Sequence, residues 1–101
     1  MLRCMQAKPN IDPDPWFLYI LECRDGSFYT GITKNIKRRV HMHEQGKASS
    51  YTRTRRPVRL LYEEPCGNRV AALVRECAVK TLSRKEKEIL IARKFPLTSL
   101  A

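Results

Sequence analysis

The chain has 101 residues and a formal net charge of +10, from 20 Lys and Arg against 10 Asp and Glu. This length is typical of one domain with a modest core, which excludes separate catalytic and regulatory domains. A positive charge of this size attracts polyanions, so nucleic acid is the favoured partner, and a solvated basic face is the alternative. No apolar run approaches the ~20 residues that span a bilayer. No membrane partner is therefore expected.

The N-terminus lacks the apolar segment of a secretory signal, so we expect a cytoplasmic protein with free thiols rather than disulfides. No two cysteines form a C-x-x-C pair, and His41 and His43 point to different sides of a helix. These spacings argue against a zinc site. The four cysteines are Cys4, Cys23, Cys66 and Cys77.

Three segments are expected along the chain. Residues 1–15 contain three prolines and predict an irregular N-terminal arm, residues 16–95 predict one folded domain, and residues 96–101 predict a short tail.

Within the domain, aromatic and β-branched runs predict strands, and apolar stripes at helical spacing predict helices. Asn35 is a good helix N-cap, Gly46 is placed to end that helix, and residues 83–86 form a capping box. Alternation of Val58, Leu60 and Tyr62 predicts a strand with one buried face. The predicted elements are strands over 16–21 and 28–33, a helix over 36–45, a loop over 47–57 with a short helical turn as an alternative, a strand over 58–63, and helices over 69–82 and 84–94. The order β-β-α-β-α-α predicts an α+β fold in which about three helices flank a three-stranded antiparallel sheet.

The first two strands form a hairpin whose register decides where two tyrosines point, because a shift of one residue turns every side chain over. A two-residue turn at 25–26 would place Tyr19 and Tyr29 on opposite faces. A three-residue loop over 24–26, with glycine in the left-handed position, pairs Tyr19 with Gly31 and puts both rings on one face. We favour this loop because Gly31 then leaves room for a ring and the other face becomes apolar.

Three charged or titratable side chains are candidates for chemistry. Arg39 and His43 lie four residues apart on one helical face, where an arginine could hold a phosphate and a histidine could move a proton. A solvated helix edge is the alternative. Glu76 lies at the edge of a buried helical stripe and could hold one Mg²⁺ with water and phosphate oxygens. The alternative is a surface carboxylate paired with Arg69, Arg75 or Lys80.

The loop over 47–57 is polar and basic, and an aromatic side chain lies among its cations. Contacts from this loop to phosphates would give salt-sensitive affinity without sequence choice. The candidate nucleic-acid-binding residues are Lys47, Tyr51, Arg53, Arg55 and Arg56.

The order of these signals resembles a known family. Leu18-Tyr19-Ile20 and Tyr29-Thr30-Gly31, followed by Arg39, His43 and a distant helical Glu76, are similar to the motifs of the GIY-YIG nuclease superfamily. The likeness covers roughly residues 16–92 and is strongest to its small stand-alone bacterial branch, the YhbQ-like proteins. Of the first motif only the tyrosine is kept, Ile32 stands where some relatives have a lysine, and no asparagine follows Asn68.

The resemblance implies hydrolysis of a phosphodiester bond with a single Mg²⁺ or Mn²⁺ ion. Tyr19 and Tyr29 would be active-site tyrosines, one of which activates or orients water. Arg39 would stabilise charge on the phosphate, His43 would assist proton transfer or contact the phosphate, and Glu76 would be the one carboxylate on the metal.

We therefore expect an endonuclease acting on DNA rather than RNA, on branched or single strands, in a repair or recombination setting. A non-catalytic nucleic-acid-binding module, or an adaptor in a repair complex, is the alternative. The protein is expected to be a monomer or weak dimer.

Overall fold

The structure, a computed structural model, describes residues 15–94. The predicted tail over 96–101, and the predicted arm apart from Pro15, lie outside the described residues. The elements are β2 (Trp16–Glu22), β3 (Phe28–Thr33), α1 (Ile36–Glu44), α2 (Ser50–Arg53), β4 (Arg59–Gly67), α3 (Arg69–Lys80) and α4 (Arg84–Lys94). The predicted α+β fold is confirmed, and the short α2 realises the helical turn considered for the basic loop.

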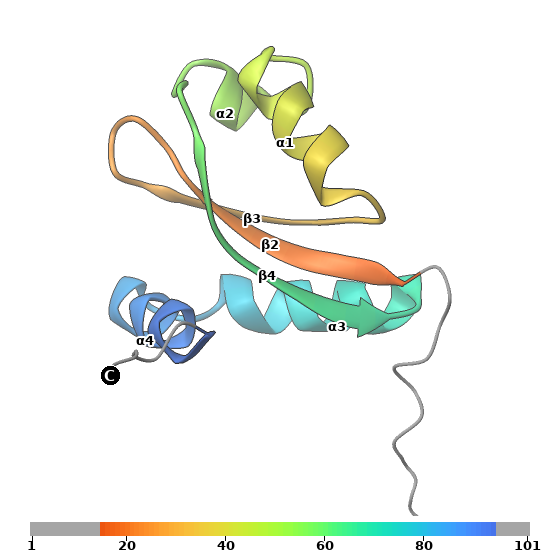
Figure 1. Cartoon of the computed structure of the whole chain (residues 1–101). Helices are drawn as coiled ribbons and strands as arrows, with labels where there is room; N and C mark the ends of the chain where they lie inside the picture. Colours follow the sequence, from red (N-terminus) through yellow and green to blue (C-terminus); the bar gives the residue numbers. More distant parts are fainter. Residues whose placement is uncertain (1–14, 95–101) are drawn as a thin grey trace, which may run out of the picture.

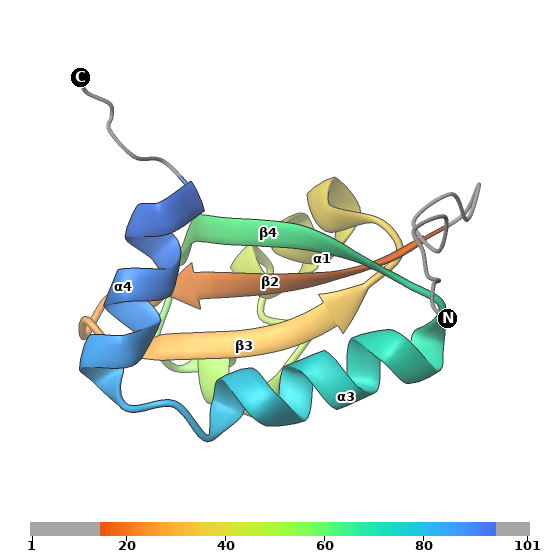
Figure 2. The same ribbon diagram turned by 90° about the horizontal axis from the view of Figure 1, so that it is seen from below.

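The sheet has the strand order β3-β2-β4, and both pairs are antiparallel. Helices α1 and α2 lie on one side of the sheet, and α3 and α4 lie on the other (Figure 1). Seen from below, α3 runs along the outer edge of β3, and α4 crosses near the ends of the strands (Figure 2). The sheet therefore separates the two helical layers, and α3 lies beside its β3 edge.

The hairpin adopts the three-residue loop. The Cys23 N–H donates to the Ser27 carbonyl at 2.8 Å, and the Gly26 N–H donates to the Cys23 carbonyl at 2.9 Å. Gly26 has a φ of +87°, the left-handed conformation that a bulge after a type I turn requires. Tyr19 pairs with Gly31 and Leu21 pairs with Tyr29, so the predicted register is confirmed.

Gly31 leaves the space that the Tyr19 ring fills. A Cβ at Gly31 would lie 2.6 Å from the Tyr19 hydroxyl oxygen and 2.7 Å from Cζ. The phenol is buried, so it cannot swing into solvent to relieve such a contact. The glycine is thus explained by close approach of an aromatic ring across the ladder, as the register predicted.

The third strand departs from the prediction. Val58 and Leu60 pack on the α1 side of the sheet, whereas Tyr62 packs on the α3 side beside Leu18 and Ile20. The pairing of β2 with β4 shifts between Ile20 and Leu21, which is a bulge that turns the side chains over. The prediction that Val58, Leu60 and Tyr62 share one face was wrong for this reason.

The strand is also longer than expected, because it continues through Pro65 to Gly67. β4 is an edge strand, where a missing N–H costs no ladder hydrogen bond if it faces outward. A second register shift lies beside Pro65, between Trp16 and Phe17 of the partner strand. Proline therefore did not end this strand.

The helix boundaries follow the predicted caps. The Asn35 side chain accepts from the Arg38 N–H at 3.0 Å at the start of α1. At the start of α4 the Ser83 N–H donates to the Glu86 carboxylate at 2.8 Å, and the Glu86 N–H donates to the Ser83 hydroxyl at 3.1 Å. This reciprocal pair is the predicted capping box.

Two apolar clusters hold the layers together. One, built on Leu18, Ile20, Tyr62 and Val79, joins the sheet to α3 and α4, and the other, built on Tyr19, Leu21, Cys23 and Val58, joins it to α1. The three cysteines among the described residues are free thiols. Within residues 15–94 no helix is long and apolar enough to cross a membrane.

The Gly31→Ala substitution should destabilise the protein by about 1–3 kcal/mol, because the added methyl group overlaps the buried phenol. Chemical denaturation of Gly31→Ala, Tyr19→Ala and the double variant measures this coupling. The cost of the methyl group should largely vanish in the Tyr19→Ala background. An equal cost in both backgrounds would show that the ring is not what excludes a side chain here.

Candidate active site

A buried hydrogen-bonded chain joins β2, α1 and α2. The Tyr19 hydroxyl lies 2.9 Å from His43 Nε2, and His43 Nδ1 lies 2.7 Å from the Thr52 hydroxyl. All three side chains are buried, with His43 and Thr52 having no exposed surface. Buried polar groups are stable when each finds a partner, so this chain fixes the phenol and the imidazole in one arrangement.

The Thr52 hydroxyl donates to the Ser49 carbonyl, over 3.4 Å, and so can accept from His43. With the imidazole proton on Nδ1, each group of the network finds a partner: Nδ1–H donates to the Thr52 hydroxyl, and Nε2 accepts from the Tyr19 hydroxyl. The lowered pKa of His43 keeps the imidazole neutral, so Nε2 retains a lone pair with which to accept. His43 is therefore not the solvated helix edge that the sequence left open, and it can reach a substrate only through Tyr19.

The pKa values keep both groups neutral. Burial, reinforced by the nearby Arg39 charge, lowers the pKa of His43 to about 4. Burial raises the pKa of Tyr19 to about 12; Arg39 opposes this rise, and Tyr29 and Glu76 add to it. Both shifts oppose transfer of the phenol proton to the imidazole. In the resting protein the Tyr19 hydroxyl is thus an oriented phenol rather than a phenolate.

Tyr29 lies beside this buried chain, on the same face of the sheet. Its ring centroid is 6.4 Å from that of Tyr19 and 5.1 Å from that of His43. On its other flank it stacks with Tyr51 at 6.0 Å and an interplanar angle of 25°. Tyr29 is half-buried, so it connects the buried network to the surface.

Arg39 reaches the same place from α1. One guanidinium nitrogen donates to the Ala48 carbonyl at 3.5 Å, and the buried Nε has no hydrogen-bond partner within the described chain. Arg39 also lines a pocket of about 440 Å³ with Trp16, Lys34 and Arg69. A guanidinium that lines an open pocket is suited to an oxyanion.

Glu76 comes from the opposite layer, on α3. Helix α3 runs along the edge of β3, and the negative charge of the Glu76 carboxylate raises the pKa of the Tyr19 phenol. The carboxylate is partly exposed and lies 3.4 Å from the Lys80 ammonium. Of the partners considered from the sequence, Lys80 makes this pair, while Arg75 pairs with Glu64 at 2.6 Å.

The described residues contain no group of three or more His, Cys, Asp or Glu side chains that could hold a metal ion. An ion at Glu76 would therefore have one carboxylate ligand, with water and substrate oxygens supplying the rest. Such a donor set fits Mg²⁺ or Mn²⁺, which keep several waters, and does not fit structural zinc.

The basic loop divides into two sides. The Arg55 guanidinium lies 3.8 Å from the centroid of the Tyr51 ring and pairs with Asp25 at 3.2 Å. Tyr51 in turn stacks on Tyr29. These two loop residues therefore extend the aromatic surface of the site.

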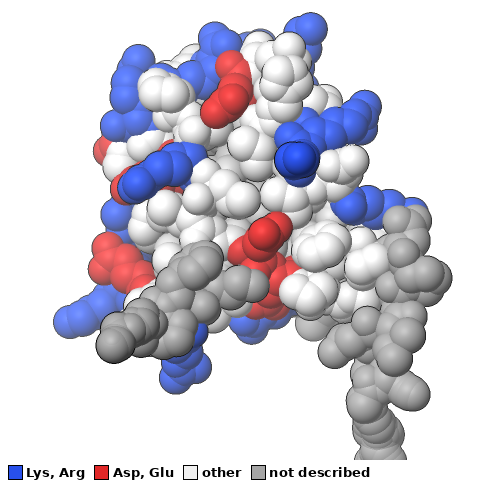
Figure 3. Space-filling model, in the orientation of Figure 1, with Lys and Arg blue, Asp and Glu red and all other residues white. Residues whose placement is uncertain are grey.

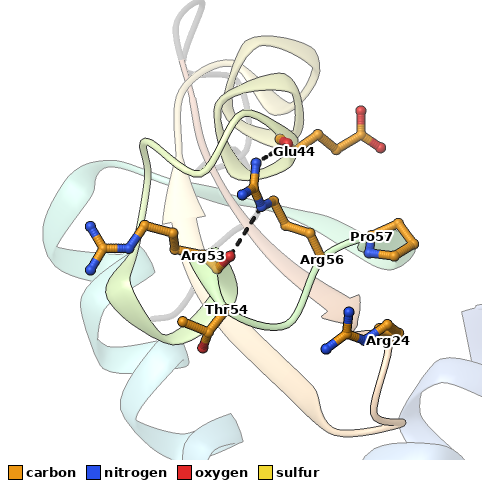
Figure 4. Close-up of a pocket in the computed structure, with 6 residues that line it drawn as sticks. All are labelled: Arg24, Glu44, Arg53, Thr54, Arg56 and Pro57. Carbon is orange, nitrogen blue, oxygen red and sulfur yellow. Dashed lines mark hydrogen bonds between the residues drawn. The ribbon is translucent and has the colours of Figure 1, made fainter.

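The other side of the loop faces a separate pocket of about 370 Å³, which Arg53 and Arg56 line with Arg24. Arg56 donates to the Arg53 carbonyl at 3.0 Å and to the Glu44 carbonyl at 3.1 Å (Figure 4). The Arg53 guanidinium and the Glu44 carboxylate both point away from these bonds (Figure 4). Lys47 is exposed and lines a third pocket with Arg53. Four of the five predicted binding residues thus line pockets, and Arg53 is shared between two of them.

The positive charge is also divided over the rest of the molecule. On the face shown in Figure 3, Lys and Arg side chains are spread around the outline, and acidic side chains interrupt them. The net charge of +10 therefore does not mark the site by itself.

Sequence reasoning missed Thr52, which holds His43 from the far side. Thr52 was one of several polar residues in a basic loop, and nothing in its spacing set it apart. The signal that could have found it is Ser49, whose side chain accepts from the Tyr51 N–H and starts α2. A helix beginning at residue 50 turns Thr52 inward.

Comparison with known proteins assigns the family. The sequence model of the GIY-YIG catalytic domain matches residues 15–89. The chain belongs to the GIY-YIG family. The match includes every candidate catalytic residue, and GIY-YIG domains have a nuclease-type fold.

Relatives of similar size match most of this GIY-YIG chain. A UPF0213 protein of Desulfotalea psychrophila is 47% identical over 91 residues, covering 89% of this chain and 82% of the relative. A UPF0213 protein of Staphylococcus saprophyticus is 44% identical over 79 residues, covering 78% and 96%. The solution structure of the UPF0213 protein BH0048 of Bacillus halodurans is 42% identical, with a TM-score of 0.54 and coverage of 82% of this chain and 88% of that one. The chain is thus similar to stand-alone domains in both sequence and fold.

The lowered pKa of His43 predicts a pH-dependent stability. In the unfolded chain the imidazole binds a proton near pH 6.5, whereas in the folded protein it does so only near pH 4. Between these values the unfolded state holds more protons, so the free energy of unfolding falls as the pH falls, by roughly 2–3 kcal/mol in total. Thermal unfolding from pH 7 to pH 4 measures this loss.

The His43→Gln variant is the control, because its side chain does not titrate. It should be less stable at pH 7 and should lose less stability on acidification. A variant with the same pH dependence as the wild type would assign the acid sensitivity to carboxylates instead.

Proposed function

We propose that this GIY-YIG domain is a metal-dependent endonuclease that hydrolyses phosphodiester bonds in DNA. The observation that carries the proposal is the convergence of a neutral phenol, a guanidinium and one carboxylate. Arg39 and Glu76 both act on the pKa of Tyr19, although they come from helices on opposite sides of the sheet. A protein that only bound nucleic acid would gain nothing from a carboxylate at this place, since it repels phosphate.

Tyr19 orients the attacking water. Its proton is held by His43 Nε2, so a lone pair of the phenol oxygen can accept a hydrogen bond from water. A phenol with a pKa of about 12 is a poor base, and its contribution is therefore position rather than full proton removal. His43 and Thr52 act as positioning residues behind it.

Arg39 stabilises the phosphate. Its anchored guanidinium offers donors to the non-bridging oxygens, where negative charge increases as water attacks. Tyr29 lies beside Tyr19 and is half-buried, so its hydroxyl is the second phenol that a substrate would meet. These residues act on the transition state and should affect turnover more than binding.

Glu76 is the residue that would hold the metal, as Mg²⁺ or Mn²⁺. The ion would supply a positive charge that stabilises the attacked phosphate and lowers the pKa of bound water. In its absence the carboxylate is neutralised by Lys80.

The net charge and the exposed aromatic side chain near the site favour a nucleic-acid strand as substrate, with DNA proposed over RNA. Cleavage of branched or single-stranded DNA would suit repair or recombination, inside the cytoplasm and away from membranes. A monomer or weak dimer suffices for this reaction, since one chain supplies every candidate group. A repair-complex partner remains part of the proposal.

The Glu76→Ala variant should lose cleavage by at least about a hundredfold and keep DNA affinity within about threefold. The reason is that the Glu76 carboxylate would bind the metal that stabilises the transition state, and it would not contact the bound, uncleaved DNA. Cleavage of labelled flaps, forks, single strands and duplexes, with and without Mn²⁺, provides the rates, and fluorescence anisotropy in EDTA provides the affinities.

Glu88→Ala is the matched control, since it removes an exposed carboxylate of α4 that pairs with Arg84. It should cleave as fast as the wild type. Equal cleavage by Glu76→Ala and wild type would end the assignment of the metal site.

Charge reversal separates the two sides of the basic loop. Arg55→Glu should weaken DNA binding and lower the salt dependence, because Arg55 supports Tyr51 beside the site. The double variant Arg53→Glu/Arg56→Glu tests the other pocket in the same way. Binding isotherms at several salt concentrations give both slopes. A side whose reversal leaves the slope unchanged is outside the interface.

A further inference from the structure

A small pocket lies beside the candidate active site, between β3, α2, α3 and α4. It has a volume of about 270 Å³ and is lined by Phe28, Tyr29, Thr30, Tyr51, Lys80 and Lys87. The pocket shares one residue with the candidate active site and is joined to it by one ion pair. Tyr29 belongs to both, and the Lys80 ammonium lies 3.4 Å from the Glu76 carboxylate.

One wall of the pocket is aromatic and held in place. Tyr51 stacks with Tyr29 at 6.0 Å, and the Arg55 guanidinium lies 3.8 Å from the centroid of the Tyr51 ring. Tyr51 as a whole is 36% exposed, so it lies at the surface, where a ligand can contact it. An exposed aromatic ring beside a cationic surface is a common support for an unstacked base.

The opposite wall is cationic. Lys80 comes from the last turn of α3, and Lys87 comes from the first half of α4. Lys87 is half-buried and makes no ion pair with any carboxylate of residues 15–94. A partly desolvated ammonium without a counter-charge is unfavourable unless a mobile anion supplies one.

Thr30 gives an independent indication that a ligand is missing. Its hydroxyl is buried and has no hydrogen-bond partner within the described chain, and the residue lines this same pocket. Buried hydroxyl groups in folded proteins are nearly always paired, so an unpaired one calls for a partner from outside the chain.

We propose that this pocket binds the nucleotide next to the cleaved bond, with Lys80 and Lys87 contacting its phosphate. The inference rests on the proposed function and names the substrate class: the strand is unpaired on this side of the cleaved bond. A pocket of this volume is at the small end for organic ligands, so it accepts one nucleotide and not two paired ones.

Lys80 then has two opposing effects. Its ammonium attracts the neighbouring phosphate, and it also repels a divalent cation at Glu76. Removing the charge should weaken strand binding and strengthen metal binding. If Lys80 only forms an ion pair with Glu76 and binds no ligand, removing its charge should leave strand binding unchanged. Metal binding alone should then strengthen, by about twofold, which corresponds to the energy typical of exposed pairs of this spacing.

Strand binding is measured in EDTA, where no cleavage occurs, with fluorescently labelled single-stranded and duplex oligonucleotides. The Lys80→Met/Lys87→Met variant should bind the single strand at least about fivefold more weakly. It should also lower the slope of log K against log salt by about 0.7, the value of one lost phosphate contact on a single strand. Lys85→Met, which removes an exposed charge from α4 outside the pocket, should leave that slope unchanged.

Metal binding is measured separately by calorimetry with MnCl₂ alone, where Lys80→Met should bind about twofold more tightly than wild type. A slope in the double variant equal to that of Lys85→Met would overturn the proposal. An equal loss of affinity for duplex would overturn the claim that the strand is unpaired.

These outcomes are distinct from failure of the nuclease assignment. If the wild type cleaves DNA and the double variant keeps the wild-type salt slope, only the assignment of this pocket is wrong. If the double variant has a lower salt slope but the wild type cleaves no substrate, the pocket still binds a strand and the nuclease assignment is wrong.

Discussion

The buried hydrogen bond between Tyr19 and His43 is the constraint on which the site depends. It places a phenol, an imidazole and the Thr52 hydroxyl where water cannot satisfy them, so each must find its partner within the protein. The ring also requires a glycine across the ladder, and the imidazole requires α2 to turn a hydroxyl inward. Two buried hydrogen bonds and one close contact with Gly31 thus link a strand pair to two helices, and they fix the orientation of the phenol.

The charged groups of the site are arranged differently from this polar chain. Arg39 and Glu76 come from helices on opposite sides of the sheet, and each acts on the pKa of Tyr19. Because the phenol and imidazole remain neutral, the positive and negative charges that act on a substrate all lie nearer the surface. The buried groups therefore fix the orientation of the phenol, and in the proposed reaction the charged groups nearer the surface would act on the substrate.

The sequence predicted the parts that follow from local rules. The hairpin register followed from one loop length and from Gly31, and the helix boundaries followed from Asn35 and Ser83. The face of Tyr62 could not be predicted, because a bulge inserts a residue without requiring glycine or proline. The role of Thr52 was also hidden, since its partner His43 is nine residues away on another helix. The sequence thus predicted the pairing that a short loop fixes, but not the contacts between elements that are joined by longer segments.

The distribution of charge explains why net charge alone is a weak guide to this site. Several cations are already engaged: Arg55 with Asp25, Arg75 with Glu64 and Arg84 with Glu88. Others face a pocket away from the tyrosines. A diffuse positive field of this kind raises the encounter rate with any polyanion but cannot select a bond. Under the proposed function, selection of the bond would arise at the edge of β3, where Tyr29, Tyr51 and Lys80 line one pocket and Lys80 pairs with Glu76.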